Sequence, residues 1–107
     1  MPIAKKWSSY TKENIKAIDK DLIGTYEIGN SKKNTILYIG EGQIRARLLA
    51  HFPDGKRPEE IVVGADVFRF EITDTKHQAV LQQNHHLSVF KGNNQDKLPK
   101  YNQRSKN

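Results

Sequence analysis

The sequence of 107 residues contains no cysteine, and this absence excludes both a disulfide framework and a zinc site built from thiolates. No stretch approaches the roughly 20 consecutive apolar residues that a membrane-spanning helix needs, and the first residues lack the apolar run of a secretory signal. The sequence also holds no internal repeat. The length predicts a single compact domain. The lack of an apolar span and of a signal predicts a soluble protein in the cytoplasm.

Acidic side chains are in the minority. Eighteen Lys and Arg residues against 12 Asp and Glu residues give a formal net charge of +6. An excess of positive charge favours polyanionic partners, because it steers their approach and because contact with phosphates releases counterions. Charge alone does not distinguish nucleic acid from an acidic protein or an anionic membrane surface.

The first part of the sequence predicts a helix followed by a β-hairpin. Possible capping hydroxyls precede Ile15 and Ile18 at helical spacing, which favours a short amphipathic helix over residues 7–19. Residues 25–28 and 35–39 are strand-like, and the polar, turn-rich segment between them predicts a hairpin.

The pattern becomes helical after the hairpin. Ile44, Leu48 and Phe52 fall on one face of a helix that Pro53 ends. A second long helix is predicted from the possible caps Asp74 and Thr75 to about Phe90, and the segment after it is rich in Asn, Lys and Gln.

A third strand is predicted at residues 65–73, where two kinds of side chain alternate. Phe68 and Ile72 share one parity, and Arg69 and Glu71 share the other. We therefore expect one buried face and one face exposed to water. Strands and helices in this order indicate an α+β protein.

Five polar side chains stand out as candidates for a site. Alternation places Tyr26 and Tyr38 within reach across the hairpin, as a packing pair or as functional groups. Arg47 and His51 share one rim of the first apolar helix face, where the simple alternative is a solvated Arg and a half-buried His. Gln83 points to the core side of the second helix, so it is either a hydrogen-bonded core residue or faces a cleft.

Five short segments resemble, in order and spacing, the motifs of the GIY-YIG nuclease superfamily. Residues 24–26 (GTY) and 38–40 (YIG) are similar to its paired tripeptides. Residues 44–51 resemble the helix with the family's Arg and His, and residues 78–84 resemble the segment with its metal-binding Glu. Residues 98–102 resemble its terminal motif, which ends in a functional Asn.

The resemblance implies an architecture and an activity. The fold would be a small central three-stranded antiparallel sheet flanked by helices, with an extra N-terminal helix. Residues 1–23 would form this N-terminal helical extension, residues 24–102 the nuclease domain and residues 103–107 a basic tail. The activity would be hydrolysis of DNA phosphodiester bonds with Mg²⁺ or Mn²⁺, in repair, recombination or defence, in the cytoplasm or at the nucleoid.

The resemblance also implies a role for each catalytic residue. Tyr26 would be the general base, with Tyr38 and His51 assisting proton transfer or orienting water. Arg47 would neutralise charge on the phosphoryl oxygens, and Asn102 would hydrogen-bond to shape the site. The pKa of an unperturbed phenol is about 10, so we expect nearby positive charge, from Arg47 and the metal, to lower the pKa of Tyr26.

Gln83 departs from the family's pattern, because a Glu in this place would bind the metal. The neutral amide offers one weaker oxygen ligand, so cleavage should be crippled. Gln83 is either a deliberate replacement of Glu that holds substrate without cutting it, or the natural residue of a non-catalytic module that binds DNA or RNA. Glu41, where some members carry a basic residue, is a second departure.

Contacts with nucleic acid are expected from one glycine and three basic residues: Gly40, Arg45, Lys100 and Arg104. Phosphate contacts give register and salt dependence without sequence preference, so we expect a structure-guided or weakly specific enzyme acting on duplex, branched or single-stranded DNA. Cutting both strands of a duplex with one site per chain needs either two copies, as in a homodimer, or two encounters. The three histidines of the second helix region, His77, His85 and His86, are expected at the surface.

Overall fold

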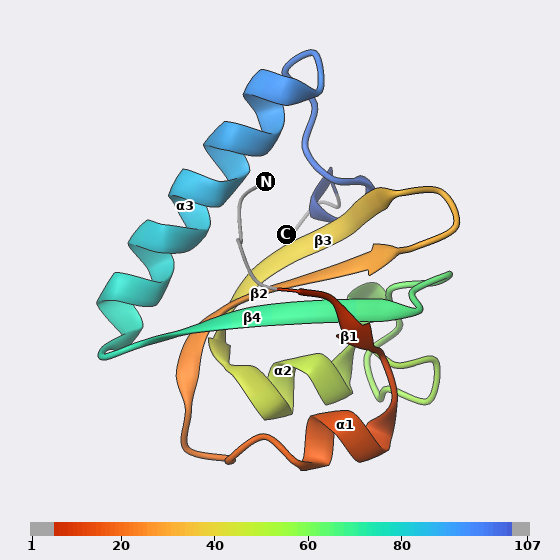
Figure 1. Cartoon of the computed structure of the whole chain (residues 1–107), viewed down its shortest axis with the longest axis vertical. Coiled ribbons are helices and arrows are strands. Elements are labelled where there is room, and N and C mark those ends of the chain that lie inside the picture. The colour runs from red at the N-terminus through yellow and green to blue at the C-terminus, as the bar shows by residue number, and fades with distance from the viewer. Residues whose placement is uncertain (1–5, 104–107) are drawn as a thin grey trace.

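The computed structural model describes residues 6–103 as a four-stranded antiparallel sheet with helices on both faces (Figure 1), which confirms the α+β class. The elements in chain order are β1 (Ser8–Ser9), α1 (Lys12–Lys16), β2 (Ile23–Asn30), β3 (Thr35–Gln43), α2 (Ile44–Ala50), the 3-10 helix η1 (Pro58–Glu60), β4 (Val67–Thr73), α3 (Lys76–Asn93) and the 3-10 helix η2 (Lys100–Gln103). No helix in this part of the chain has the length and apolar character to cross a bilayer.

The sheet is larger than the predicted three strands. Its order is β1-β4-β2-β3, so β2 lies in the middle and β3 at an edge. The predicted strands correspond to β2, β3 and β4, and the added strand β1 pairs with β4 through Ser8 opposite Phe68. A strand of two residues cannot display an alternating pattern, which is why the sequence did not indicate it.

The N-terminal helix is shorter than the predicted span of residues 7–19. It begins after Thr11, whose side-chain oxygen accepts a hydrogen bond from the backbone N–H of Asn14 at 3.2 Å. A hydroxyl in this place satisfies one of the free N–H groups of the first turn. The apolar positions Ile15 and Ile18 are buried as expected and pack into the main hydrophobic core.

The sheet separates two layers of different character. Helices α1 and α2 lie on one side of it and the long helix α3 lies on the other (Figure 1). On the α1 and α2 side, Tyr26 and Ile28 of β2 form the core with Phe68 of β4 and Leu48 of α2, and all four are buried. Burial of this apolar surface is the main stabilising contribution to the fold.

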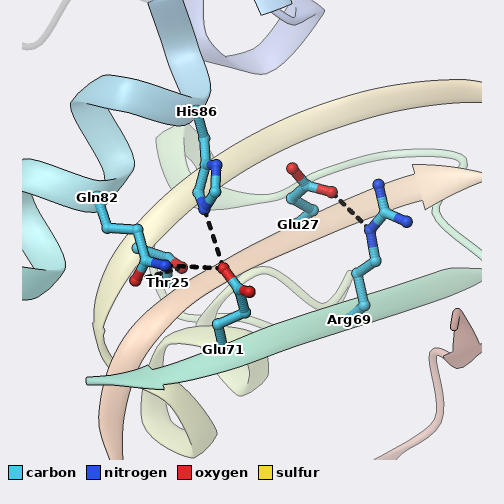
Figure 2. A network of polar contacts seen from close by, with 6 residues as sticks. All are labelled: Thr25, Glu27, Arg69, Glu71, Gln82 and His86. Atoms are coloured by element: carbon cyan, nitrogen blue, oxygen red, sulfur yellow. Dashed lines mark hydrogen bonds and ion pairs between the residues drawn. The ribbon is translucent and has the colours of Figure 1, made fainter. Parts of the chain in front are cut away.

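The other face of β4 contradicts the expectation of a face exposed to water, because α3 covers it. Arg69 is 4% exposed and donates from Nε to Glu27 Oε1 of β2 at 2.7 Å. Beside this pair, Glu71 accepts hydrogen bonds from Gln82 Nε2 at 2.8 Å and His86 Nε2 at 3.2 Å, both on α3 (Figure 2). The polar side chains of β4 were expected to face solvent, but Arg69 and Glu71 instead make hydrogen bonds within the protein.

Two further predictions about this region are wrong. His86, expected at the surface, is 3% exposed, whereas His77 and His85 are exposed as predicted. Ile72, assigned to the buried parity, is 52% exposed because it lies near the end of β4.

The helices and the C-terminal segment end differently from the predicted limits. Helix α2 stops at Ala50 with His51 as its C-cap, before Pro53 is reached, and α3 continues past Phe90 to Asn93. The chain then returns to the free edge of the sheet. There the side chain of Asn102 donates to the carbonyl of Ile39 and accepts from its N–H, both at 2.8 Å.

Candidate functional site

A cavity of about 560 Å³ opens where β3 runs into α2. Four of the predicted catalytic residues line it, and each comes from a different element: Tyr26 from β2, Tyr38 from β3, Arg47 from α2 and Gln83 from α3. Because β3 is an edge strand, the cavity takes side chains from both faces of the sheet. The fold therefore brings these four residues to one place.

His51 joins the site through Tyr26. The hydroxyl of Tyr26 lies 2.8 Å from His51 Nε2, and His51 Nδ1 contacts the backbone carbonyl oxygen of Glu60. A carbonyl only accepts, so Nδ1 carries the proton and Nε2 is the acceptor for the Tyr26 hydroxyl. The rings of Tyr38 and His51 also lie close, with centroids 4.7 Å apart. The two tyrosines and the histidine form one contiguous cluster.

Burial raises the pKa of the Tyr26 phenol well above its ordinary value of 10.0, and the neighbouring phenol of Tyr38 raises it further. Arg47 acts in the expected direction and lowers this pKa, but its effect is smaller than that of burial. Arg47 therefore acts on the Tyr26 pKa as expected, but in the chain without a cation burial outweighs it. At neutral pH Tyr26 is a phenol that donates to His51.

Arg47 is held beside the phenol by an acidic partner. Its Nη2 lies 2.5 Å from Glu60 Oε1, and this hydrogen bond holds the pKa of the Glu60 carboxyl below its usual value. Gly42 has a φ of +127° and leaves room for the Arg47 stem, because a Cβ there would lie 3.3 Å from Arg47 Cγ. The guanidinium is thus oriented but still partly exposed, as a group that binds phosphate has to be.

The side chain of Gln83 lines the cavity, and no hydrogen bond joins this side chain to another residue among residues 6–103. Besides Arg47, two further charged side chains line the cavity, Glu41 from β3 and Lys76 from the first turn of α3. Neither was among the predicted site residues. Lys76 precedes Gln83 by two helical turns, which puts both on one face, and this spacing was the available signal for it.

Comparison with known families gives a match to a domain of unknown function (DUF7508) over residues 1–88. The chain belongs to DUF7508. No curated protein and no solved structure matches it. The matched span includes the cavity residues from Tyr26 to Gln83 and leaves Asn102 outside.

Two glycines of the tripeptide motifs have a structural reason in this DUF7508 chain. A Cβ at Gly24 would lie 1.9 Å from the carbonyl oxygen of Glu71, so a side chain there would separate β2 from β4. A Cβ at Gly40 would lie 2.3 Å from the Tyr26 hydroxyl oxygen. Gly40, expected to contact nucleic acid, therefore also provides the space in which the Tyr26 phenol lies.

The remaining predicted residues do not line the cavity. Asn102 binds the backbone of β3 at Ile39, next to Gly40, and supports the strand from outside. Arg45 is half-buried on α2, and Lys100 is exposed with its Nζ 5.4 Å from the centre of the Tyr101 ring. Arg104 lies outside the described residues.

No three His, Asp or Glu side chains among residues 6–103 are grouped as a metal site. A cation that takes most of its ligands from water and substrate does not need such a group. In this member of DUF7508 the carboxylate and amide side chains that line the cavity are those of Glu41, Gln43 and Gln83.

Proposed function

We propose that this member of DUF7508 is a metal-dependent endonuclease of the GIY-YIG kind that hydrolyses DNA phosphodiester bonds with structural or weak sequence preference. The observation that carries the proposal is the meeting of Tyr26, Tyr38, Arg47 and Gln83 in one cavity from four different elements. Residues in the resemblance come from distant parts of the chain, so an accidental sequence likeness would not require them to be neighbours.

The geometry supports a proton relay through Tyr26. A water molecule beside the Tyr26 oxygen would attack the scissile phosphorus, pass its proton to that oxygen, and the phenol proton would move to His51 Nε2. The bond from phosphorus to the leaving oxygen breaks as the new one forms, and the leaving alkoxide would take a proton from solvent. The raised pKa of Tyr26 suits this role, because the phenol never has to persist as a phenolate.

Positive charge supports the same reaction. Arg47 would donate to the phosphoryl oxygens as negative charge grows there, and Lys76 would hold the adjacent part of the backbone. A divalent cation, when bound, would neutralise further charge on the scissile phosphate. Gln83 would provide one weak oxygen ligand for Mg²⁺ or Mn²⁺, which makes the chain a slow enzyme as it stands.

A nicking assay tests the proposal. Supercoiled plasmid, branched DNA and single-stranded DNA are incubated with Mg²⁺ or Mn²⁺ and either the Gln83 chain or Gln83→Glu. We expect Gln83→Glu to nick at least one substrate at about 100 times the rate of the Gln83 chain or more, and Arg47→Ala in that background to lose about 100-fold to 1000-fold. Gln78→Glu adds the same charge at an exposed position of α3 and should leave the rate unchanged.

A non-catalytic DNA- or RNA-binding module is the second candidate, because the residue in the metal-binding place is a neutral amide. It predicts no nicking by Gln83→Glu on any substrate, together with binding that weakens steeply as salt rises. The endonuclease proposal is wrong if this combination is observed. Weak binding that ignores salt would count against both candidates.

The endonuclease proposal has two consequences for the cell. The enzyme would act on chromosomal or invading DNA, in the cytoplasm or at the nucleoid. One site per chain cuts one strand at a time, so a double-strand break would need two copies, and we expect a homodimer on duplex DNA. Nicks that accumulate long before linear plasmid would argue for action as a monomer.

A further inference from the structure

We propose that Glu41 supplies the carboxylate of a divalent-cation site in the cavity, with the amide oxygen of Gln83 as a second protein ligand. This inference deepens the proposed function and rests on it for the role of the cation. It adds a carboxylate ligand on β3 to the expected ligand position on α3. The ligand chemistry of the site then no longer depends on residue 83 alone.

The evidence begins with an orphaned oxygen. Glu41 Oε2 is buried and has no hydrogen-bond partner among residues 6–103. The four ion pairs within 4.0 Å in this part of the chain do not include Glu41. A buried carboxylate oxygen without a partner is unfavourable, and such groups are paired or bind metals in folded proteins.

The position of Glu41 matches a cation beside the scissile phosphate. It lies between Gly40 and Gly42 on β3 and lines the cavity. The same cavity contains Tyr26 and Arg47, the groups proposed to act on the phosphate. A cation on Glu41 would therefore share its site with the reacting phosphodiester.

The donor set favours a hard cation. One carboxylate and one amide carbonyl are oxygen ligands, and Mg²⁺ typically takes one or two carboxylates, several waters and substrate phosphate oxygens. Mn²⁺ accepts the same ligands. Arg47 and Lys76 add positive charge to the cavity, so the cation alone should bind weakly and a phosphodiester should strengthen its binding.

Lys76 is the competing partner for Glu41. Both line the cavity, but no ion pair joins them. If Lys76 neutralised Glu41 in solution, no cation would bind there. This alternative is an outcome of the experiment below.

Mn²⁺ alone is the probe, because its binding is measured directly by electron paramagnetic resonance and calorimetry at near-neutral pH. We expect the Gln83 chain to bind one Mn²⁺, Glu41→Gln to weaken this binding at least tenfold and Gln83→Glu to strengthen it about tenfold. Asp96→Asn removes the same charge at an exposed position outside the cavity and should change the affinity less than twofold. Equal binding by the Gln83 chain and Glu41→Gln would overturn the proposal, as would no binding by the Gln83 chain.

A second measurement needs no variant. In a ¹H–¹⁵N spectrum of the Gln83 chain, substoichiometric Mn²⁺ should broaden the side-chain amide of Gln83 and the backbone amides of Gly40 to Gly42 before the amide of Asp96. Broadening confined to other residues would overturn the assignment. Glu41→Gln should itself fold, because it removes an unpaired charge, and its thermal midpoint without cation should equal or exceed that of the Gln83 chain.

The two proposals fail separately. Cation binding that depends on Glu41, without nicking by Gln83→Glu on any substrate, leaves the site standing and removes the endonuclease. Nicking by Gln83→Glu that is unchanged in Glu41→Gln/Gln83→Glu, with Mn²⁺ affinity that is also unchanged, leaves the endonuclease standing and removes the role of Glu41.

Discussion

Arg69→Met should destabilise the fold strongly, because it leaves the carboxylate of Glu27 buried without its partner. The two side chains are 3% and 0% exposed, so solvent does not screen their interaction. Removing one partner of a buried ion pair costs about 3–5 kcal/mol. The same substitution removes the contact of the Arg69 guanidinium with the Trp7 ring, 4.0 Å from its centroid, worth about 0.5–2 kcal/mol.

The loss should depend on pH in a defined direction. Burial raises the pKa of Glu27 above 4.5, and Arg69 partly lowers it again. Without Arg69 this pKa rises further. Each unit of rise lowers the free energy of unfolding by about 1.4 kcal/mol more once the carboxyl is ionised. A carboxyl with a raised pKa binds more protons in the folded state. Its stabilising contribution is therefore full below about pH 4.5 and is lost as pH rises through the folded-state pKa.

Urea unfolding followed by far-ultraviolet circular dichroism provides the measurement, at about pH 5 and about pH 7.5. We expect a larger deficit for Arg69→Met at the higher pH. Glu27→Leu/Arg69→Met replaces both charges by apolar groups and should recover most of the loss, because such replacements are often neutral or stabilising. Equal losses for the single and double variants at both pH values would refute the reasoning.

Three further perturbations have defined outcomes. Tyr26→Phe should leave the absorbance titration of the folded chain near pH 10 unchanged, because burial raises the pKa of this phenol well above 10.0. A titrating group lost near pH 10 would contradict the raised pKa. Asn102→Ala removes two hydrogen bonds to Ile39, so urea unfolding should show a loss of about 1–3 kcal/mol and the Ile39 amide should exchange its hydrogen faster. Gly40→Ala should destabilise the fold by more than about 2 kcal/mol because its Cβ would overlap the Tyr26 hydroxyl. Gly92→Ala on α3 has open space around it and should stabilise the fold by about 0.5–1 kcal/mol. Similar effects of the two substitutions on the thermal midpoint would contradict the crowding at Gly40.

Four of the residues that line the cavity were marked as candidates because each breaks or shares a local pattern in the sequence. Tyr26 and Tyr38 follow from strand alternation, and Arg47 follows from its place on the rim of an apolar helix face. Gln83 was marked by its polarity on the core side of α3. All four line the cavity. The fifth candidate, His51, does not line it but is hydrogen-bonded to the Tyr26 hydroxyl.

The buried polar layer was not predictable from alternation. A strand whose polar parity faces a helix has the same pattern as one whose polar parity faces water, and the partners of Arg69 and Glu71 are distant in sequence. Glu27 is 42 residues from Arg69 along the chain, and His86 is 15 residues from Glu71. Pairing over such separations is a property of the tertiary fold that local periodicity does not contain.

Helix α3 has only Ala79 and His86 fully buried, so apolar contacts do little to fix its rotation about its own axis. Hydrogen bonds depend on angle as well as distance, and those from Gln82 and His86 to Glu71 set that rotation (Figure 2). Gln83 follows Gln82 directly, so the same bonds decide the direction in which Gln83 points. The orientation of the Gln83 side chain therefore depends on Glu71 of β4. A substitution at Glu71 would change this orientation although Glu71 does not line the cavity.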